Sequence, residues 1–463
     1  MTTERLTPLD ASFLDVETSS AHMHVGWAAL FDPPERGPAP SFEQIRDHVG
    51  RRLRRAPRYR QRLASVPLGA GRPVWTDDEG FDVSRHVRRA AGGDLGAVAD
   101  EVMSTPLGRE HPLWELWIAD RLDDGRLGIV GKAHHCMVDG VAAVELAALL
   151  LDMEPEPAPE PQEEWRPRPA PDGARLLAGA LADRAREGLR LVEAGARAAL
   201  APQRGLQVAW GAARALAHTL APAPRVPLLN EPISPRRHLA TLGRPLDDLR
   251  RVKRAFGTTV NDVLLALAAG GVRRYMERRG ERPPRIKAMV PVNVRGDAGG
   301  LGNRITFLFL ELPCDEPDPV RRLQAIHSAT SERKDAAEPE GADAVLRLVS
   351  AGPQLIQRAF SRLAASPLTF NVVVSNIPGP PETLYMLGCP LREAYPVVPL
   401  ADRHAVSIGF TTVAGGAYFG LYADRDALPD ADALAGDLDA ELDELVERAG
   451  APAPARREPA HAH

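Results

Sequence analysis

The segment His134-His135-Cys136-Met137-Val138-Asp139-Gly140 decides the fold and lies between two predicted elements. Residues 127–133 are predicted as a strand, and residues 114–122 as a partner strand joined to it by the turn Asp123-Asp124-Gly125. The apolar run 141–151 predicts a helix that begins directly after the segment. A strand that turns into a helix combines a rigid approach with access from solvent. We therefore expect a functional group at this turn.

The two adjacent histidines are expected to have different roles. Side chains on a strand alternate between faces, so His134 and His135 point to opposite sides if the strand continues through them. One then faces a reaction site and the other supports it or packs. A neutral imidazole is a suitable general base because its ordinary pKa is close to 7. Asp139 is expected to fix the turn by pairing with an arginine, and Gly140 lets the chain enter the helix without steric conflict.

Simpler interpretations of the same segment stay open. Adjacent histidines are common as core or surface residues, and Asp139 has the side chain of an ordinary helix N-cap. A metal site is not expected, because there is no HExxH pattern and neighbours on a strand do not converge on one ion. If His135 faces the reaction site, Cys136 faces away from it, so we interpret Cys136 as a packing residue and not a nucleophile.

Composition excludes several classes of protein. The net charge of -5 over 463 residues and the 5% aromatic content argue against a nucleic-acid partner. Three widely separated cysteines are typical of a reducing compartment without disulfides or a zinc knuckle. The N-terminus lacks the apolar core of a signal peptide, and there is no run of 18 apolar residues. We expect a cytoplasmic protein, with peripheral attachment to the inner membrane face or to lipid droplets left open.

The length and pattern of the chain predict two mixed α/β domains. In the first, residues 24–31 alternate like a half-buried strand, and Ser41-Phe42-Glu43-Gln44 fits the capping box of a helix. The second is similar in size and pattern, which favours a pseudo-duplicated architecture. We expect domains at 1–152 and 236–450, a connecting region at 153–235 and a disordered tail at 451–463.

The connecting region has two parts. Residues 153–171 are rich in proline and acidic residues and are predicted to form an extended linker. Residues 174–222 are rich in Ala, Leu and Arg at helical spacing, with a break near Pro202. One interpretation is a pair of helices that bridges the domains. The other is a basic amphipathic surface for anionic membranes or lipid droplets.

The second domain is predicted to alternate helices with strands. Helices are expected at 246–256, 260–279, 345–364 and 431–448, and strands at 286–292, 305–312, 369–375 and 405–412.

The chain resembles a known family in several segments. HHxxxDG resembles the signature of acyltransferases with a chloramphenicol-acetyltransferase-like fold, which include the condensation domains of peptide synthetases. Further segments resemble motifs of the bacterial wax ester synthase/acyl-CoA:diacylglycerol acyltransferase family and occur in family order, covering nearly the whole chain. They are PLDASFL (8–14), VNDV (260–263), PVNVR (291–295), GN (302–303), NVVVSNIPGP (371–380), FGL (419–421) with Asp424, and LPD (428–430). The acidic character of the proline-rich linker is unusual.

The resemblance implies an α/β (α+β) fold with two chloramphenicol-acetyltransferase-like domains. Mixed sheets flanked by helices are expected in each domain, with a helical linker and a channel between the domains. By the same resemblance, His135 is the general base, His134 supports it, and Asp139 is structural with Arg295 as its candidate partner.

Further residues are assigned to the channel by the resemblance. Asn261, Asp262 and Asn376 would shape it or an acyl or CoA site. Capping is an equally good explanation of the Asn261-Asp262 pair at a helix start. Proline and glycine alone explain the turn after Asn376, without a functional role for Asn376. Residues 8–14 are expected to be a packing element.

The resemblance implies an O-acyltransferase that moves a fatty acyl group from acyl-CoA to diacylglycerol or a long-chain alcohol. We expect direct transfer, since there is no GxSxG nucleophile motif, and no resident cofactor or metal, with acyl-CoA as a substrate. Two rivals are a condensation-like enzyme that uses a carrier-protein thioester and a non-catalytic lipid- or droplet-binding relative. The acceptor, the acyl chain length, the oxyanion-stabilising group and the oligomeric state are left open.

Overall fold

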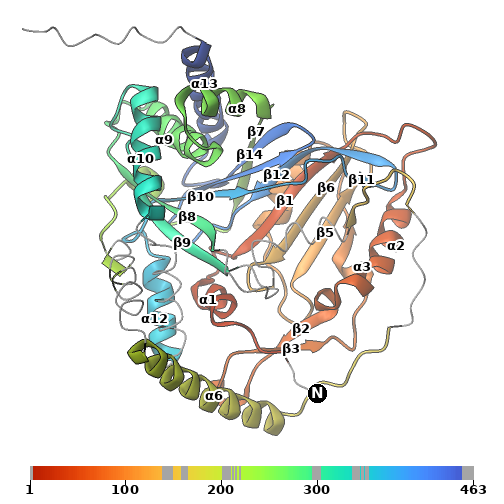
Figure 1. Cartoon of the computed structure of the whole chain (residues 1–463). Helices are drawn as coiled ribbons and strands as arrows, with labels where there is room; N and C mark the ends of the chain where they lie inside the picture. Colours follow the sequence, from red (N-terminus) through yellow and green to blue (C-terminus); the bar gives the residue numbers. More distant parts are fainter. Residues whose placement is uncertain are drawn as a thin grey trace, which may run out of the picture.

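Two six-stranded sheets make up the body of the protein (Figure 1). They belong to a computed structural model that describes residues 4–137, 150–157, 165–200, 210, 213, 216–217, 221–294, 304–335, 345, 349 and 354–450. The first sheet has the order β11 (Tyr385–Met386), β12 (Cys389–Val397), β1 (His24–Phe31), β6 (Leu127–His134), β5 (Trp114–Ala119), β4 (Val87–Arg89). The predicted strands at 24–31 and 127–133 are central to it, and β1 pairs antiparallel with β6 so that His24 lies opposite His134.

The second sheet is mixed, as predicted. Its order is β7 (Arg237–Pro245), β14 (Gly416–Asp424), β13 (Val406–Val413), β10 (Val372–Ile377), β8 (Ile286–Val294), β9 (Arg304–Leu312). Strand β10 is parallel to both of its neighbours, whereas the outer pairs are antiparallel. A separate two-stranded sheet pairs β2 (Gln61–Ala64) with β3 (Val74–Asp77).

Helices flank the sheets. Those beside the first sheet are α2 (Phe42–Arg52), α3 (Val83–His86) and α4 (Leu95–Ser104). Those over the second are α8 (Leu246–Phe256), α9 (Val260–Arg278), α10 (Pro319–Asp335) and α13 (Ala431–Gly450). Short 3-10 helices span Leu53–Arg55, Pro57–Arg60, Pro67–Gly69 and Pro227–Leu229. Helix α2 begins with the predicted capping box between Ser41 and Gln44.

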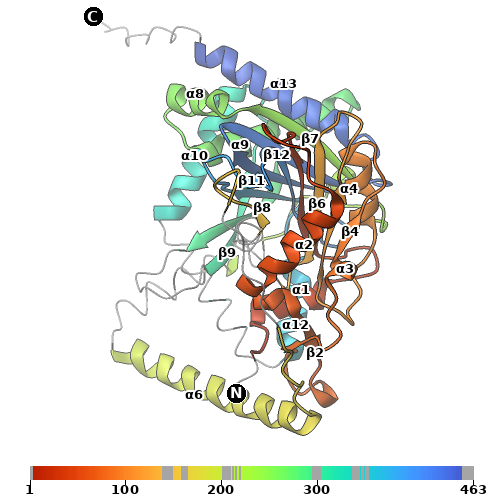
Figure 2. The same ribbon diagram turned by 90° about the vertical axis from the view of Figure 1, so that its right-hand side faces the viewer.

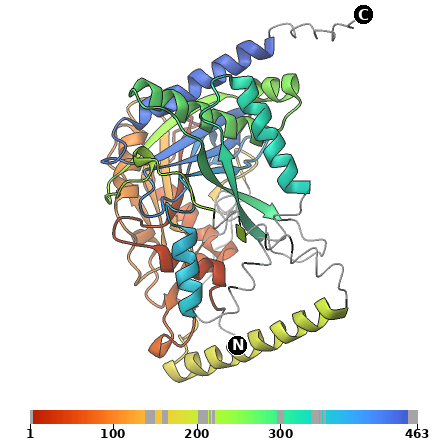
Figure 3. The ribbon, with the colours of Figure 1, turned by 90° about the vertical axis from the view of Figure 1, so that its left-hand side faces the viewer.

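Three more helices gather at the end of the molecule opposite α13. They are α1 (Pro8–Val16), α12 (Gln354–Ala364) and α6 (Gly173–Leu200). Helix α6 matches the first part of the predicted helical stretch 174–222 and runs along the edge of the molecule (Figures 2 and 3). Its first turns dock on the N-terminal half through buried Leu176 and Ala180 and through an Arg5–Asp183 ion pair of 2.8 Å.

Strand β12 crosses the boundary that was expected between the two domains. It belongs to residues 236–450, yet it pairs with β1 and completes the first sheet. It also packs across the second sheet, where a Cβ on Gly420 would lie 2.1 Å from the carbonyl oxygen of Pro396. A side chain at Gly420 would therefore push the crossing strand away. Local periodicity did not predict this crossing because it depends on contacts between residues far apart in the chain.

Buried apolar side chains form one core beside each of the two large sheets and a further core between the sheets. The core between the sheets combines Leu30 and Val130 of the first sheet with Val373 of the second and Tyr395 of β12. Apolar contacts of this kind hold the two halves in one fixed arrangement.

None of the described helices is by itself both long and apolar enough to span a membrane. Helices α8 and α9 pass only as a pair bent by 101°.

Candidate active site

His135 follows the last residue of β6 and continues its pairing with the chain before β1. Its backbone N–H donates to the carbonyl oxygen of Met23 at 2.9 Å. Its half-buried ring stacks on the ring of Phe13, with centroids 3.7 Å apart and planes 8° from parallel. The strand ladder and this stack therefore fix the imidazole from two directions.

His134 is the last residue of β6 and is 2% exposed. Its Nδ1 accepts the backbone N–H of Cys136 at 3.1 Å, so the proton of the neutral ring is on Nε2. Burial lowers the pKa of His134 to about 3, with a further contribution from the charge of Arg109. His134 is therefore neutral near pH 7. It holds the turn that presents His135, which is a supporting arrangement.

A carboxylate lies next to the buried face of His134. Oε1 of Glu17 is 3.7 Å from Nε2 of His134, and the same carboxylate forms an ion pair with Arg109. Glu17 ends α1, where its backbone N–H donates to the carbonyl oxygen of Phe13. One end of α1 thus contributes to the surroundings of both histidines, since Phe13 stacks on His135.

An apolar cavity of about 150 Å³ lies next to residues that contact His135. Phe13 and Met23, which both contact His135, line it together with side chains from α1, α12 and the second sheet. Phe307, Phe309, Phe360 and Phe370 are among the aromatic residues that line it. A cavity of this composition suits an aliphatic chain.

A second apolar cavity, of about 490 Å³, lies on β1, β12 and β13. Residues 377–380 of the predicted SNxPGP motif line it, together with the charged residues Arg55, Asp152 and Glu382. A Cβ on Gly379 would lie 1.9 Å from the carbonyl oxygen of Thr412, so this turn requires glycine. Asn376 itself is exposed near the end of β10, and its predicted role in the channel stays a prediction.

The Asn261-Asp262 pair lies at the start of α9. The carboxylate of Asp262 accepts the backbone N–H of Thr259 at 2.9 Å, and the Thr259 hydroxyl accepts that of Asp262, which completes a capping box. Asp262 also accepts from Thr330 at 2.7 Å and lies 2.8 Å from Nδ1 of His327. These partners are all in the C-terminal half. The structure favours the capping interpretation for Asp262.

The thiol of Cys136 is buried. Burial raises its pKa far above the ordinary value, which keeps the sulfur protonated and a poor nucleophile. The prediction that Cys136 packs is consistent with this environment.

Three predicted site residues, Asp139, Gly140 and Arg295, lie outside the described residues. Their proposed roles stay predictions. Among the residues that the structure does describe, no group of three or more His, Cys, Asp or Glu side chains is arranged to hold a metal ion.

Sequence reasoning missed the contributions of Phe13, Glu17, Met23 and Arg109. Phe13 was expected only to pack, and the other three were not singled out. Glu17 and Arg109 are 92 positions apart, so no local pattern joins them. A signal was available only for Phe13, through the PLDASFL segment that contains it.

The two mixed sheets, the crossing strand and the histidine turn beside an apolar cavity define an acyltransferase of the chloramphenicol-acetyltransferase-like class. Residues 6–264 match the wax ester synthase/diacylglycerol acyltransferase catalytic domain, and residues 301–446 match the corresponding C-terminal domain. The chain belongs to the wax ester synthase/diacylglycerol acyltransferase family, which confirms the resemblance and the predicted acyltransferase activity.

Individual relatives support this assignment. The chain is 32% identical over 455 residues to tgs1 of Mycobacterium tuberculosis H37Rv, described as a probable diacylglycerol O-acyltransferase, and the match covers 95% of each chain. It is 33% identical over 470 residues to tgs2 of the same organism, covering 96% of this chain and 99% of tgs2.

Solved structures confirm the predicted fold class. The wax ester synthase/diacylglycerol acyltransferase of Marinobacter aquaeolei VT8 is similar with a TM-score of 0.69 and 28% identity, covering 97% of this chain and 100% of that one. The first condensation domain of the CDA synthetase shares the fold, with a TM-score of 0.56, 18% identity and coverage of 98% and 97%.

Proposed function

We propose that His135 is the general base for direct transfer of a fatty acyl group from acyl-CoA to the hydroxyl of diacylglycerol or a long-chain alcohol. The observation that carries this proposal is the position of His135. Its ring is held against Phe13, which lines an apolar cavity together with Met23. A fatty acyl chain in this cavity would bring its polar end close to the proposed base.

The reaction balances with one base. His135 takes the proton of the acceptor hydroxyl as the oxygen attacks the thioester carbonyl, forming a tetrahedral oxyanion. Collapse of the oxyanion keeps the new C–O bond and breaks the C–S bond. The imidazolium then gives its proton to the CoA thiolate. The proposed route uses acyl-CoA as a substrate and needs no resident cofactor.

The decisive assay compares wild type with His135→Ala in the presence of one labelled acyl-CoA and a mixture of acceptors. We expect labelled triacylglycerol or wax ester from wild type and a loss of about 10²-fold or more in the variant. A folded wild type that makes no ester from any acceptor would favour the lipid-binding rival. Activity with a carrier-protein thioester alone would favour the condensation-like rival.

The acceptor is proposed to approach from the end of the molecule that carries α6 and α12. Helix α12 contributes Phe360 and Ala364 to the cavity, while Ile356 on the same helix is 56% exposed. On α6, Leu181 and Leu189 are 57% and 65% exposed. A lipid acceptor held in a membrane or droplet surface at this end would be close to the cavity.

Charge supports an anionic lipid surface as the partner. Arg184 and Arg186 are exposed on α6, close to Leu181 and Leu189 in the sequence. Apolar side chains flanked by arginines are typical of helices that lie in the headgroup region. The proposal therefore places the enzyme peripherally on the cytoplasmic membrane face or on lipid droplets.

Flotation with liposomes that contain an anionic phospholipid tests the surface proposal. We expect the double variant Leu181→Ser and Leu189→Ser to float less than wild type. Met153→Ser is a matched control. Met153 is also exposed, at 69%, but it lies beside the first sheet, since the preceding Asp152 pairs with Tyr385 of β11. Equal flotation of wild type and the double variant, or of wild type and a folded protein without residues 174–222, would contradict the proposal.

A further inference from the structure

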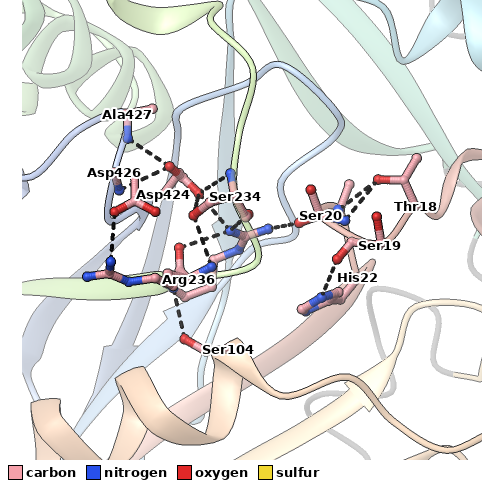
Figure 4. Close-up of polar contacts among 12 residues, drawn as sticks. Thr18, Ser19, Ser20, His22, Ser104, Ser234, Arg236, Asp424, Asp426 and Ala427 are labelled. Carbon is pink, nitrogen blue, oxygen red and sulfur yellow. Dashed lines mark hydrogen bonds and ion pairs between the residues drawn. The ribbon is translucent and has the colours of Figure 1, made fainter.

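The chain between α1 and β1 forms a tight turn at residues 18–21. The backbone N–H of Thr18 donates to the carbonyl oxygen of Ala21 at 3.0 Å. The Thr18 hydroxyl accepts the backbone N–H groups of Ser20 and Ala21 at 3.3 and 2.9 Å (Figure 4). The turn is therefore closed mainly by one exposed threonine.

Both histidines of the site are contacted by residues that flank this turn. Glu17, directly before it, faces Nε2 of His134. Met23, two residues after it, accepts the backbone N–H of His135 at 2.9 Å. Met23 has a φ of 49°, which most side chains avoid, so its carbonyl direction depends on the surrounding structure. A shift of the turn would move the partner of His135.

Arg237, at the start of β7 in the C-terminal half, reaches this turn. It is 1% exposed, and its guanidinium donates to the carbonyl oxygen of Ser20. The same guanidinium forms an ion pair of 3.0 Å with Asp424, which is fully buried at the end of β14. The guanidinium of Arg237 also donates to the backbone carbonyl oxygens of Ser234 and Arg236, at 2.6 and 3.0 Å.

Asp424 is itself fixed by several donors. Its carboxylate accepts the backbone N–H and hydroxyl of Ser234 at 2.8 and 2.9 Å, and the backbone N–H groups of Asp426 and Ala427 at 3.1 and 2.7 Å (Figure 4). This aspartate ends the FGL motif, and the acyl-transfer chemistry leaves it without a role. Its surroundings make it a rigid anchor for Arg237.

Burying a charged pair costs desolvation free energy, so the presence of such a pair is by itself weak evidence that it stabilises the fold. A well-hydrogen-bonded pair nevertheless fixes geometry, because any displacement leaves a buried charge without a partner. Here the fixed geometry joins the C-terminal sheet to the turn beside the histidines.

We infer that Arg237 is a positioning residue for acyl transfer: anchored by Asp424, it holds the turn at residues 18–21 and so sets the orientation of His135 through Met23. The inference rests on the proposed role of His135. It assigns a function to the contact between the two halves and gives the buried aspartate of the C-terminal motif a part in catalysis at a distance.

Thr18→Val tests the inference without touching the buried pair. Valine keeps the shape of threonine but cannot accept the hydrogen bonds that close the turn. We expect kcat to fall about tenfold or more, because small displacements of a catalytic group are costly. KM for acyl-CoA should stay within about twofold. Thr18→Ser retains the hydroxyl and is expected to behave like wild type.

Arg237→Lys tests the anchor itself. A lysine lacks the fork that reaches Asp424 and Ser20 together, so we expect kcat to fall with KM little changed. Arg250→Gln is the matched control, since the side chain of Arg250 is 53% exposed and pairs with Asp247 on α8, outside this network. It should leave kcat unchanged.

The double variant Thr18→Val with Arg237→Lys separates positioning from general damage. Two changes that act through one turn should not multiply, so the double variant should be about as slow as the slower single variant. Circular dichroism and thermal melts confirm that each protein is folded at the assay temperature.

Wild-type kcat in a folded Thr18→Val protein would overturn the inference, as would rate losses that multiply or losses confined to KM. If the His135→Ala variant were as active as wild type, the proposed role of His135 as the base would instead be refuted. The two failures are therefore distinguishable.

Discussion

The imidazole of His135 lies flat against the ring of Phe13, and this contact restricts the orientation of the proposed base. HHxxxDG pointed to this residue, whose role as a base stays a prediction, and strand alternation predicted that its neighbour has another role. The stack was not predictable, because 122 positions separate the two rings and the PLDASFL segment was expected only to pack. Alternation also assigned Cys136 to packing, and its buried thiol is consistent with that.

Replacement of Phe13 by leucine should lower kcat about two- to tenfold, because an aromatic stack contributes about 0.5–1.5 kcal/mol beyond simple burial. Phe13→Tyr keeps a ring and serves as the control. Steady-state kinetics on the purified variants measure the effect. Equal kcat values for Phe13→Leu and wild type would show that the stack does not orient His135.

Cys136→Ala should retain activity within about threefold of wild type, since a buried protonated thiol is no nucleophile. Iodoacetamide should likewise leave the folded enzyme active. Complete loss of activity in a folded Cys136→Ala protein would mean that the sulfur takes part in the reaction.

At the scale of single elements, the prediction was most accurate where periodicity or capping is strong. The capping box at Ser41 and helices α8, α9 and α13 lie where they were expected. Helix α4 and strands β7, β12 and β14 were not predicted. Strand β12 is recruited by β1 and by the close approach at Gly420, and both depend on contacts between distant parts of the chain. Asp262 shows that a family motif residue also has a local structural role.

Asp262→Ala should lower the free energy of unfolding by about 2 kcal/mol or more, because the change removes a helix cap and leaves buried donors unsatisfied. Urea denaturation followed by circular dichroism gives the value. The matched control is Asp247→Ala in the first turn of α8, where the side chain is 80% exposed. Its effect should stay within about 0.5 kcal/mol. Equal midpoints for the two variants would contradict the capping role.

At the scale of the whole molecule, polar and charged contacts join the two halves beside the proposed reaction centre. Arg237 of β7 donates to the carbonyl oxygen of Ser20 in the N-terminal half. His238 of β7 lies 2.8 Å from Asp100 of α4, also in the N-terminal half, and 2.9 Å from Asp432 of α13 in its own half. The sequence predicted two domains but not these bridges, since pairing between distant charges leaves no local pattern. The hydrogen bond to Asp100 is the main cause that raises the pKa of His238 to about 9.

This raised pKa predicts how stability depends on pH. The pKa of His238 in the unfolded chain, 6.5, is lower than its pKa in the folded protein. The stabilisation of the fold by protonated His238 is therefore complete below pH 6.5 and is lost as pH rises through about 9. Its upper limit is about 3 kcal/mol, and partial exposure reduces it. Denaturation midpoints of wild type and His238→Asn at pH 6, 8 and 9.5 should converge with rising pH. A difference that stays constant would contradict the bridge.

The central claim is that His135 performs base catalysis of acyl transfer, and the labelled acyl-CoA assay on matched folded proteins tests it most directly. Wild type should form triacylglycerol or wax ester, and His135→Ala should be slower by about 10²-fold or more with its fold and melting temperature preserved. A folded His135→Ala protein as active as wild type would contradict the account.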